Sequence, residues 1–262
     1  MPFAVAAGTS TLFGSPRGPP TNVDIPAATA KGIPVLHAPG RNADGVAEMT
    51  IALLFAVNRH VLRGDADVRA GNVFHNGTIP YQRFRAWQLA GRTAGIVGLG
   101  AIGRATKWRL EGLGMTVRSI DPYADDATDT DLDTMLAACD VVSMHAAVTP
   151  ATFGLMNADR FAAMRPGAIY LNSARAALHD TDALVDALSA GRLGGAGLDH
   201  FEGEALPEGH PLLDQDNVVL TPHIGGATYD TESNHTAMIA ADLDALLRGA
   251  KPRHCANPEV LR

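Results

Sequence analysis

Three short segments in the second half of the chain carry side chains that could bind a carboxylate and move a proton. They read Asn172-Ser173-Ala174-Arg175, Asp199-His200-Phe201-Glu202-Gly203-Glu204 and Thr221-Pro222-His223-Ile224-Gly225-Gly226. An arginine such as Arg175 can hold a carboxylate through two parallel hydrogen bonds and polarise an adjacent carbonyl. A histidine and a carboxylate that reach one cleft from separate segments form an acid/base pair, because the carboxylate favours the protonated imidazole. The three segments therefore predict acid–base chemistry on a substrate that carries a carboxylate.

A glycine-rich segment earlier in the chain, Gly98-Leu99-Gly100-Ala101-Ile102-Gly103, has the pattern G-x-G-x-x-G. It follows a predicted strand and opens a predicted helix, and Asp121 stands 18 residues after Gly103, at the end of the next predicted strand. In this context the glycines allow a tight turn, close approach of the backbone to a pyrophosphate and close packing of the helix, while the acid binds the adenosine ribose. The free N–H groups at the start of the helix favour the diphosphate. We predict a dinucleotide site, and the expected cofactor contacts are Gly98, Gly100, Ala101, Ile102, Gly103, Asp121 and His145, which ends a further predicted strand.

Asp121 also bears on the choice of dinucleotide. A carboxylate at this position accepts hydrogen bonds from both ribose hydroxyls and repels a 2′-phosphate, so the sequence favours NAD over NADP. Arg118 stands three residues earlier, and in a strand an odd spacing directs it to the face opposite Asp121.

Alternating strand and helix patterns supply the elements that must position these residues. From Arg92 onward, short apolar runs such as TAGIVG, DVVSMH and AIYLN alternate with helical segments. Strands that alternate with helices predict a mostly parallel, doubly wound α/β sheet of the Rossmann type, covered on both faces. Before this region, a long apolar helix is expected from Asp44 or Gly45 to about Leu62, followed by a polar loop. The ligands of such a sheet bind outside the carboxyl ends of its strands, where the predicted site residues stand.

Composition excludes several classes of protein. Lys and Arg number 21 and Asp and Glu 28, which gives a net charge of −7, and hydrophobic residues make up 46% of the 262 residues. The sequence therefore predicts a folded chain without the basic surface needed to bind nucleic acid or an anionic membrane. Cys139 and Cys255, the two cysteines, have no metal-type spacing, so neither a disulfide scaffold nor a metal site is expected, and a reducing, cytoplasmic location is favoured. The longest apolar stretch, nine residues from Met49 to Val57 interrupted by Thr50, is far short of the ~20 that span a bilayer.

Taken together, these segments resemble the D-isomer-specific 2-hydroxyacid dehydrogenases, the family of D-lactate, D-glycerate and D-3-phosphoglycerate dehydrogenases. The resemblance runs from Thr21 to about Leu261 and includes NVDIPAATAKGIPV, APGRNADGVAEMT, GRTAGIVGLGAIGRA, LNSAR, GLDHFEGE, LTPHIGGAT and NPEVL. It implies that Arg175 binds and orients the substrate, that His223 is the acid/base and that Glu204 is its carboxylate partner. It also implies that Asp199 holds the nicotinamide carboxamide. Formate dehydrogenases of the same fold carry glutamine where Glu204 stands, so that branch is disfavoured.

Three residues near these motifs depart from the family pattern. Arg175 is followed by Ala176 where the family commonly has glycine, His200 stands where a small apolar residue is usual, and Ala147 stands where proline is usual. Of these, Ala176 is the one expected to alter the loop beside the substrate. None of the departures removes a chemical group from the predicted site.

The front of the chain departs further. Members of the family carry several strand–helix units before the segment that matches TNVDIPAATAKGIPV, whereas 20 residues precede Thr21 here. A glycine-rich run that holds the substrate carboxylate in the family reads Arg17-Gly18-Pro19-Pro20, and proline has no N–H to donate. The expectation is a substrate-binding domain with an incomplete front, formed by residues 1–40 and 224–262, around a NAD-binding domain at 41–223.

The sequence thus predicts an oxidoreductase that transfers a hydride between NAD(H) and a D-2-hydroxy acid or its 2-keto acid, a small-molecule substrate whose identity is left open. Two alternatives also stay open: a NAD-sensing binding protein on the same fold, as in the related transcriptional corepressors, and a catalytically impaired, shortened homologue. The resemblance further implies a homodimer formed through the nucleotide-binding domain.

Overall fold

The computed structural model describes residues 12–261, which belong to two compact units. The central unit is Val46–Gly225, and the terminal unit combines the chain up to Gly45 with the segment from Gly226 onward. These limits differ slightly from the domain limits expected from the sequence. The substrate-binding role of the terminal unit stays a prediction.

A six-stranded parallel sheet forms the middle of the central unit, as the sequence predicted. Its strands are β3 (Thr93–Val97), β4 (Thr116–Ile120), β5 (Val141–Met144), β6 (Ala168–Asn172), β7 (Leu193–Leu198) and β8 (Val218–Leu220). They pair in parallel in the order β4-β3-β5-β6-β7-β8. The strand order reverses direction between β3 and β5. In sheets of this kind, a crevice opens at that point outside the carboxyl ends of the strands.

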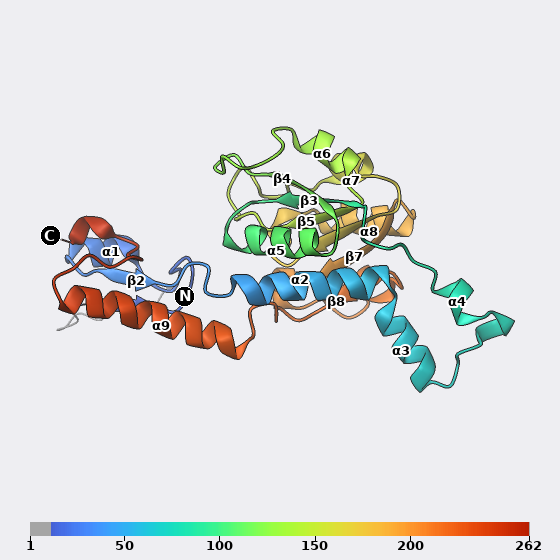
Figure 1. The fold of residues 1–262 in the computed structure, drawn as a ribbon, viewed down its shortest axis with the longest axis horizontal. Helices are drawn as coiled ribbons and strands as arrows, with labels where there is room; N and C mark the ends of the chain where they lie inside the picture. Colours follow the sequence, from blue (N-terminus) through green and yellow to red (C-terminus); the bar gives the residue numbers. More distant parts are fainter. Residues whose placement is uncertain (1–11, 262) are drawn as a thin grey trace. The chain divides into compact units, whose positions relative to one another are not determined.

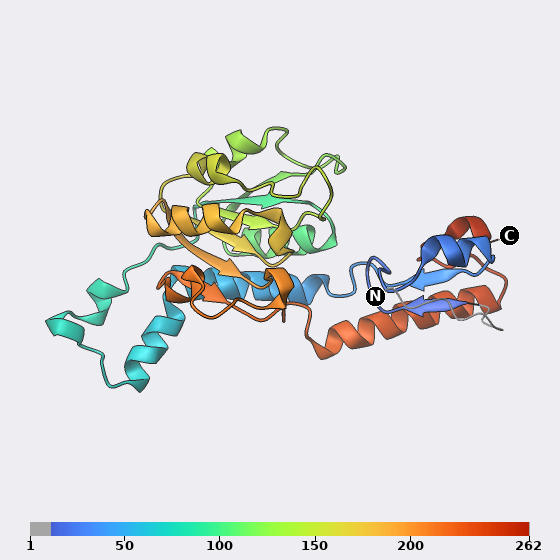
Figure 2. The same cartoon turned by 180° about the vertical axis from the view of Figure 1, so that it is seen from behind.

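Helices cover both faces of this sheet (Figures 1 and 2). On one face, α2 (Ala43–Asn58) and α5 (Ala101–Gly112) contribute Leu53, Leu54 and Leu110 to a buried cluster with Ile96 of β3. On the other face, α6 (Leu132–Ala138), α7 (Ala158–Ala163) and α8 (Thr181–Ser189) pack into a second cluster around Tyr170 of β6. Because both faces are covered, central strands such as β5 and β6 are buried along their whole length rather than alternating, which is why these short runs in the sequence could be recognised as buried strands.

The long helix expected to end near Leu62 is shorter than the sequence indicated. Helix α2 ends at Asn58, and His60 adopts a left-handed backbone conformation with φ of +52° before α3 (Val61–Arg69) begins. The expected polar loop contains α3 and a short α4 (Pro80–Arg83). This segment, which we call the arm (residues 61–85), leads away from the sheet in Figure 1. No single helix of the described chain has the length and apolar character of a membrane span, although α2 and α3, bent by 62°, pass on these two criteria as a pair.

In the terminal unit, two short parallel strands and two helices are joined. β1 (Phe13–Ser15) pairs with β2 (Val35–His37), and α1 (Ile25–Ala30) and α9 (Tyr229–Leu247) are the helices. Asn257, fully buried, accepts from the N–H of Val35 and donates to the carbonyl of Ile33, which fixes the segment around Asn257 beside β2.

The remaining elements of the two units are short 3-10 helices at His75–Gly77, Ala176–Leu178, Glu202–Glu204, Pro211–Asp214 and Pro258–Val260.

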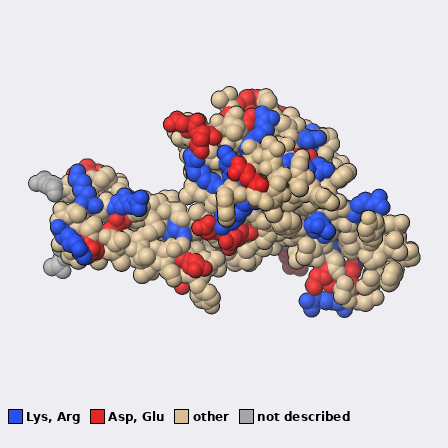
Figure 3. Space-filling model, in the orientation of Figure 1, with Lys and Arg blue, Asp and Glu red and all other residues tan. Residues whose placement is uncertain are grey.

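Charges of both signs are interspersed over the described surface that faces the viewer in Figure 3. This agrees with the mildly acidic composition.

Candidate active site

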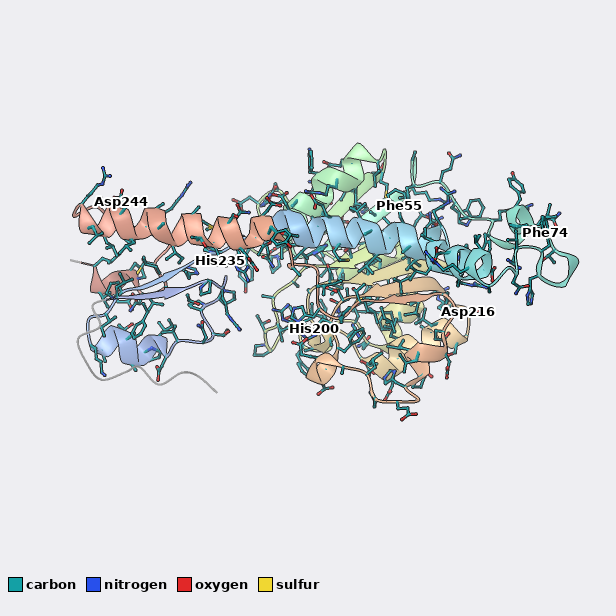
Figure 4. All side chains as sticks on the ribbon, turned by 90° about the horizontal axis from the view of Figure 1, so that it is seen from below. Phe55, Phe74, His200, Asp216, His235 and Asp244 are labelled. Atoms are coloured by element: carbon teal, nitrogen blue, oxygen red, sulfur yellow. The ribbon has the colours of Figure 1, made fainter. Side chains whose placement is uncertain are left out.

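The residues that the sequence singled out gather at the carboxyl end of the central sheet. At least one of them stands in the segment that follows each of the six parallel strands: Gly98–Gly103 after β3, Asp121 after β4, His145 after β5, Arg175 after β6, Asp199 and Glu204 after β7, and His223 after β8. Figure 4 labels His200, at this end of the sheet, and Asp216, which precedes β8 at the opposite end. The strand ends therefore bring together residues that lie up to 125 positions apart in the sequence.

The glycine loop has the shape of a cradle for a phosphate group. Gly98 has φ of +95°, and a Cβ there would lie 2.5 Å from the backbone N of Ala146. At Gly103 a Cβ would lie 2.0 Å from the carbonyl oxygen of Gly98, so only glycine lets α5 approach β3 this closely. Gly100, by contrast, has nothing within 4 Å of the position of a Cβ, and α5 begins after it without a side-chain cap. The uncapped N–H groups and the open space beside Gly100 fit the diphosphate of a dinucleotide.

Asp121 is tied to the same loop. Its carboxylate accepts hydrogen bonds from the backbone N–H of Leu99 at 2.7 Å and of Tyr123 at 2.9 Å. Two backbone donors leave the carboxylate oxygens with further lone pairs, which the two hydroxyls of a ribose can use. The nearby Arg118 is paired with Asp129, and this pairing lowers the pKa of the Asp129 carboxyl.

His145 lies next to the glycine loop, after β5. One ring nitrogen, Nε2, is 2.8 Å from the hydroxyl oxygen of Ser143, while Nδ1 is buried and has no partner among the described residues. Burial lowers the pKa of His145 to about 4, so the imidazole is neutral at neutral pH. A buried polar atom without a partner beside the cradle fits the expected contact with a dinucleotide.

Asp199 holds the loop that carries His223. Its buried carboxylate accepts from the hydroxyl of Thr221 at 2.6 Å and from the backbone N–H groups of Ile224 at 2.9 Å and Gly225 at 2.7 Å. Thr221 was not singled out by the sequence for this role. The contact of Asp199 with a nicotinamide carboxamide stays a prediction.

His223 and Glu204 form a close pair. The Nδ1 atom of His223 is 2.8 Å from Oε2 of Glu204, so the ring donates Nδ1–H to the carboxylate and keeps Nε2 for another partner. This hydrogen bond to His223 lowers the pKa of the Glu204 carboxyl, which is therefore ionised at neutral pH. The geometry is that of an acid/base pair, with a carboxylate that fixes the tautomer of the imidazole.

Arg175 presents a guanidinium group to solvent. Its side chain is exposed and has no ion pair among the described residues, although it donates to the carbonyl of Ala174 at 2.6 Å. Asn172, which is buried, donates to the carbonyl of Arg175 at 2.9 Å and accepts from the N–H of Ala174 at 3.0 Å, and it also donates to Nδ1 of His179 at 2.9 Å. Arg175 thus lies on a loop whose backbone is fixed by hydrogen bonds, and its charge is available to a carboxylate.

Asn172 and His200 are two further residues of this region whose contacts were not anticipated. The sequence placed Asn172 at the head of the arginine segment without giving it a role, and noted His200 only as a departure from the family. In the structure, His200 lies between Ala176, whose N–H it accepts, and Glu204. Three of these contacts join a side chain to the backbone of a loop, and such contacts leave no pattern of residue types that could have revealed them.

Comparison with known proteins agrees with this arrangement. The family model "D-isomer specific 2-hydroxyacid dehydrogenase, NAD binding domain" matches residues 51–225, a range that contains the glycine loop, Arg175, Glu204 and His223. A glyoxylate reductase from Thermofilum pendens is 40% identical over 249 residues, which are 92% of this chain and 73% of that protein. A D-3-phosphoglycerate dehydrogenase from Archaeoglobus fulgidus is 36% identical, and the match covers 90% of this chain and 45% of that protein.

Among solved structures, a D-isomer specific 2-hydroxyacid dehydrogenase from Lactobacillus delbrueckii ssp. bulgaricus in its NAD complexed form has a TM-score of 0.84. Its identity to this chain is 26%, and the similarity covers 94% of this chain and 79% of that one.

Proposed function

Because the chain belongs to the D-isomer specific 2-hydroxyacid dehydrogenase family, we propose that it interconverts a D-2-hydroxy acid and its 2-keto acid with Arg175, His223 and Glu204 as its catalytic residues. The observation that supports this assignment is the 2.8 Å pairing of His223 with Glu204 at the same sheet edge as an exposed, unpaired Arg175. NAD binding follows from the family and from the glycine loop.

The cofactor would lie along the carboxyl end of the sheet. The loop Gly98–Gly103 would hold its diphosphate, and Asp121 its adenosine ribose. The bound nicotinamide supplies or accepts the hydride, and this chain provides orientation and the proton. Asp199 would direct the nicotinamide amide, and the neutral His145 offers its unpartnered nitrogen to the same ligand.

His223 moves the proton at its Nε2 atom. In the reducing direction the ring is an imidazolium, and Nε2–H donates to the substrate carbonyl oxygen as C2 receives the hydride. In the oxidising direction the ring is neutral, and Nε2 accepts the hydroxyl proton as the C2–H bond breaks. Glu204 stays ionised through both directions and stabilises the imidazolium, while Arg175 binds the substrate carboxylate in two-point geometry.

For the substrate, we favour a small 2-keto acid such as glyoxylate. The support is that several similar proteins, from Thermofilum, Thermococcus and Pyrococcus species, are glyoxylate reductases of which this chain covers about three quarters. D-3-phosphoglycerate dehydrogenases are also similar to the chain, but the match covers less than half of their length.

A substrate panel tests the proposal. NADH oxidation is measured with glyoxylate, hydroxypyruvate, pyruvate and 3-phosphohydroxypyruvate, for the wild type and for His223→Ala. We expect highest catalytic efficiency with glyoxylate or hydroxypyruvate, and a loss of about 10²- to 10⁴-fold in His223→Ala with NADH binding retained. NADH binding without turnover of any keto acid would contradict the proposal and favour the NAD-sensing alternative or the impaired homologue.

We further propose a homodimer formed through the central unit. The arm exposes large apolar side chains, with Val68 66%, Phe74 70% and Tyr81 80% accessible, and no residue of α3 or α4 is buried. Apolar surface of this kind on a projecting segment is typical of an interface. Sedimentation equilibrium of a Val68→Glu/Phe74→Glu double variant should show a monomer, whereas the control Leu213→Glu, also at an exposed apolar residue, should remain dimeric. A monomeric wild type would contradict the proposal.

A cytoplasmic location is also proposed. It is supported by the free thiols of Cys139 and Cys255, because unbridged cysteines suit a reducing compartment.

A further inference from the structure

His200 is a histidine of the site without a role in the proton transfer proposed for His223. It follows β7 by two residues, its side chain is only 15% exposed, and its ring centroid lies 4.7 Å from that of His223. The suitable ligand atoms of His200, Glu204 and His223 lie within 4.8 Å of one another. A second imidazole is thus in direct contact with the acid/base pair.

The backbone of Ala176 determines which nitrogen of His200 carries the proton. The N–H of Ala176 donates to Nδ1 of His200 at 3.2 Å, so Nδ1 must present a lone pair. Burial and, secondly, the charge of Arg175 lower the pKa of His200, which favours the neutral ring. A neutral imidazole with an acceptor at Nδ1 has its proton at Nε2.

That proton is directed at the carboxylate on which the acid/base histidine depends. Nε2 of His200 lies 3.6 Å from Oε1 of Glu204, while Oε2 of the same carboxylate takes the hydrogen bond from His223. At 3.6 Å the first contact is too long for a full hydrogen bond and acts as a charge–dipole attraction. The positive end of the same N–H dipole also opposes a positive charge on His223. The N–H dipole of His200 therefore acts on both members of the His223–Glu204 pair.

We propose that His200 is a positioning residue that shares the Glu204 carboxylate with His223 and, through its other nitrogen, holds the Ala176 backbone beside Arg175. The inference rests on the proposed function and deepens it, since it links the proton-transfer pair to the substrate-binding loop. It joins two of the positions at which the chain departs from the family, Ala176 and His200, by one hydrogen bond.

Other ionisable groups around the two imidazoles leave the inference intact. In the described central unit, Arg175, Asp199 and Glu204 act on His200 through their charges, together with His223. Asp199 already accepts from three donors of the loop after β8, and burial lowers the pKa of the adjacent His179 to about 4, so it stays uncharged at neutral pH. Glu204 is therefore the ionised group whose close contact changes when His200 is replaced.

Two substitutions separate the two contacts. Asparagine at position 200 keeps an acceptor in the place of Nδ1 and loses the N–H directed at Glu204. Glutamine keeps a donor in the place of Nε2 and loses the acceptor for Ala176. His200→Asn should therefore move the high-pH limb of keto acid reduction and the low-pH limb of oxidation upward by about 0.5 to 1 pH unit, with little change in KM. His200→Gln should leave both limbs in place and raise KM for the keto acid about threefold, the cost of one lost hydrogen bond.

NMR of the histidine ring nitrogens gives a readout that needs no turnover. In the wild type at neutral pH, the nitrogen shifts of His200 should show a neutral ring protonated at Nε2, and His223 should titrate at a higher pH in His200→Asn than in the wild type. The resonances are assigned with His200→Gln and His223→Gln. A wild-type His200 protonated at Nδ1, or an unchanged or lower titration of His223 in His200→Asn, would overturn the inference. An unchanged KM in His200→Gln would overturn the role proposed for the hydrogen bond between Ala176 and His200. Absence of keto acid turnover in the wild type would count against the proposed function alone, because the NMR outcome does not depend on it.

Discussion

His223 and Glu204 face each other across a 2.8 Å hydrogen bond, and each holds its backbone in the left-handed region, with φ of +56° and +66°. In the described chain, His60 is the one further residue other than glycine with a positive φ. Such conformations cost about 1–3 kcal/mol each and persist where the surroundings fix them. For His223 the fixing contacts come from Asp199, which holds the following two backbone N–H groups.

Replacing Glu204 with glutamine should move the pH dependence of both directions. The shape of the side chain is kept, but the charge that favours the protonated His223 is lost. The high-pH limb of reduction and the low-pH limb of oxidation should therefore both move to lower pH, by about 1 unit. Catalytic efficiency measured against pH in both directions checks this, with the neighbouring exposed Glu202→Gln as a control that leaves the limbs in place.

The same pair determines how the stabilising contribution of Glu204 changes at low pH. The hydrogen bond to His223 lowers the pKa of Glu204, so its stabilising contribution is present above the ordinary carboxyl pKa and is lost as the pH falls through the lowered value. Limbs that stay in place in Glu204→Gln would contradict the acid/base pairing.

Arg175→Lys should keep the positive charge and lose most of the activity. Lysine cannot make two parallel hydrogen bonds to a carboxylate, so substrate is held less well and in the wrong orientation. The expected effect on kcat/KM is a loss of about 10²-fold, with unchanged binding of NADH. Near-normal activity would mean that Arg175 is a surface cation without a role in the reaction.

Asp121→Ala should narrow the preference for NADH over NADPH. The change removes an acceptor for the ribose hydroxyls and a charge that repels a 2′-phosphate. It also releases the N–H of Leu99, so NADH binding should weaken as well. The ratio of catalytic efficiencies with the two cofactors measures the effect, and the exposed Asp125→Ala serves as the control. A wild-type ratio that favours NADPH would refute the assigned role of Asp121.

The buried His179 should make the fold less stable in mild acid. Burial lowers its pKa from 6.5 to about 4, so between these pH values the unfolded chain binds a proton that the folded chain excludes. The free energy of unfolding should therefore fall as the pH is lowered from 6.5 to 4, by up to about 3 kcal/mol from this residue. Denaturant unfolding at several pH values checks this, and His179→Asn, which keeps an acceptor for Asn172, should show a flatter pH dependence. Equal slopes in the two proteins would rule out this origin.

The sheet and the glycine loop could be predicted because their signals are local. Buried runs such as Thr93–Val97 and glycines at fixed offsets reflect the backbone itself, and parallel strands necessarily bring their carboxyl ends to one edge. The gathering of Arg175, Glu204 and His223 at one edge then followed from topology alone.

The break between α2 and α3 and the contact of Ala176 with His200 could not be predicted in this way. Asn58-Arg59-His60 contains neither glycine nor proline, and the left-handed conformation of His60 accompanies a tertiary contact in which Asn58 donates to the carbonyl of Trp87. The Ala176–His200 bond joins residues 24 positions apart on adjacent strand ends. Both depend on packing that a pattern of residue types does not contain.

No other side chain can make the three hydrogen bonds of Asn172. Its two amide hydrogens go to the carbonyl of Arg175 and to His179, and its oxygen accepts from Ala174. Aspartate lacks the donors, and glutamine carries the same groups one methylene too far. Loss of this asparagine therefore marks a homologous gene whose product has lost the site: a protein that keeps Arg175 but not Asn172 keeps the positive charge and loses the hydrogen bonds that fix the Arg175 backbone.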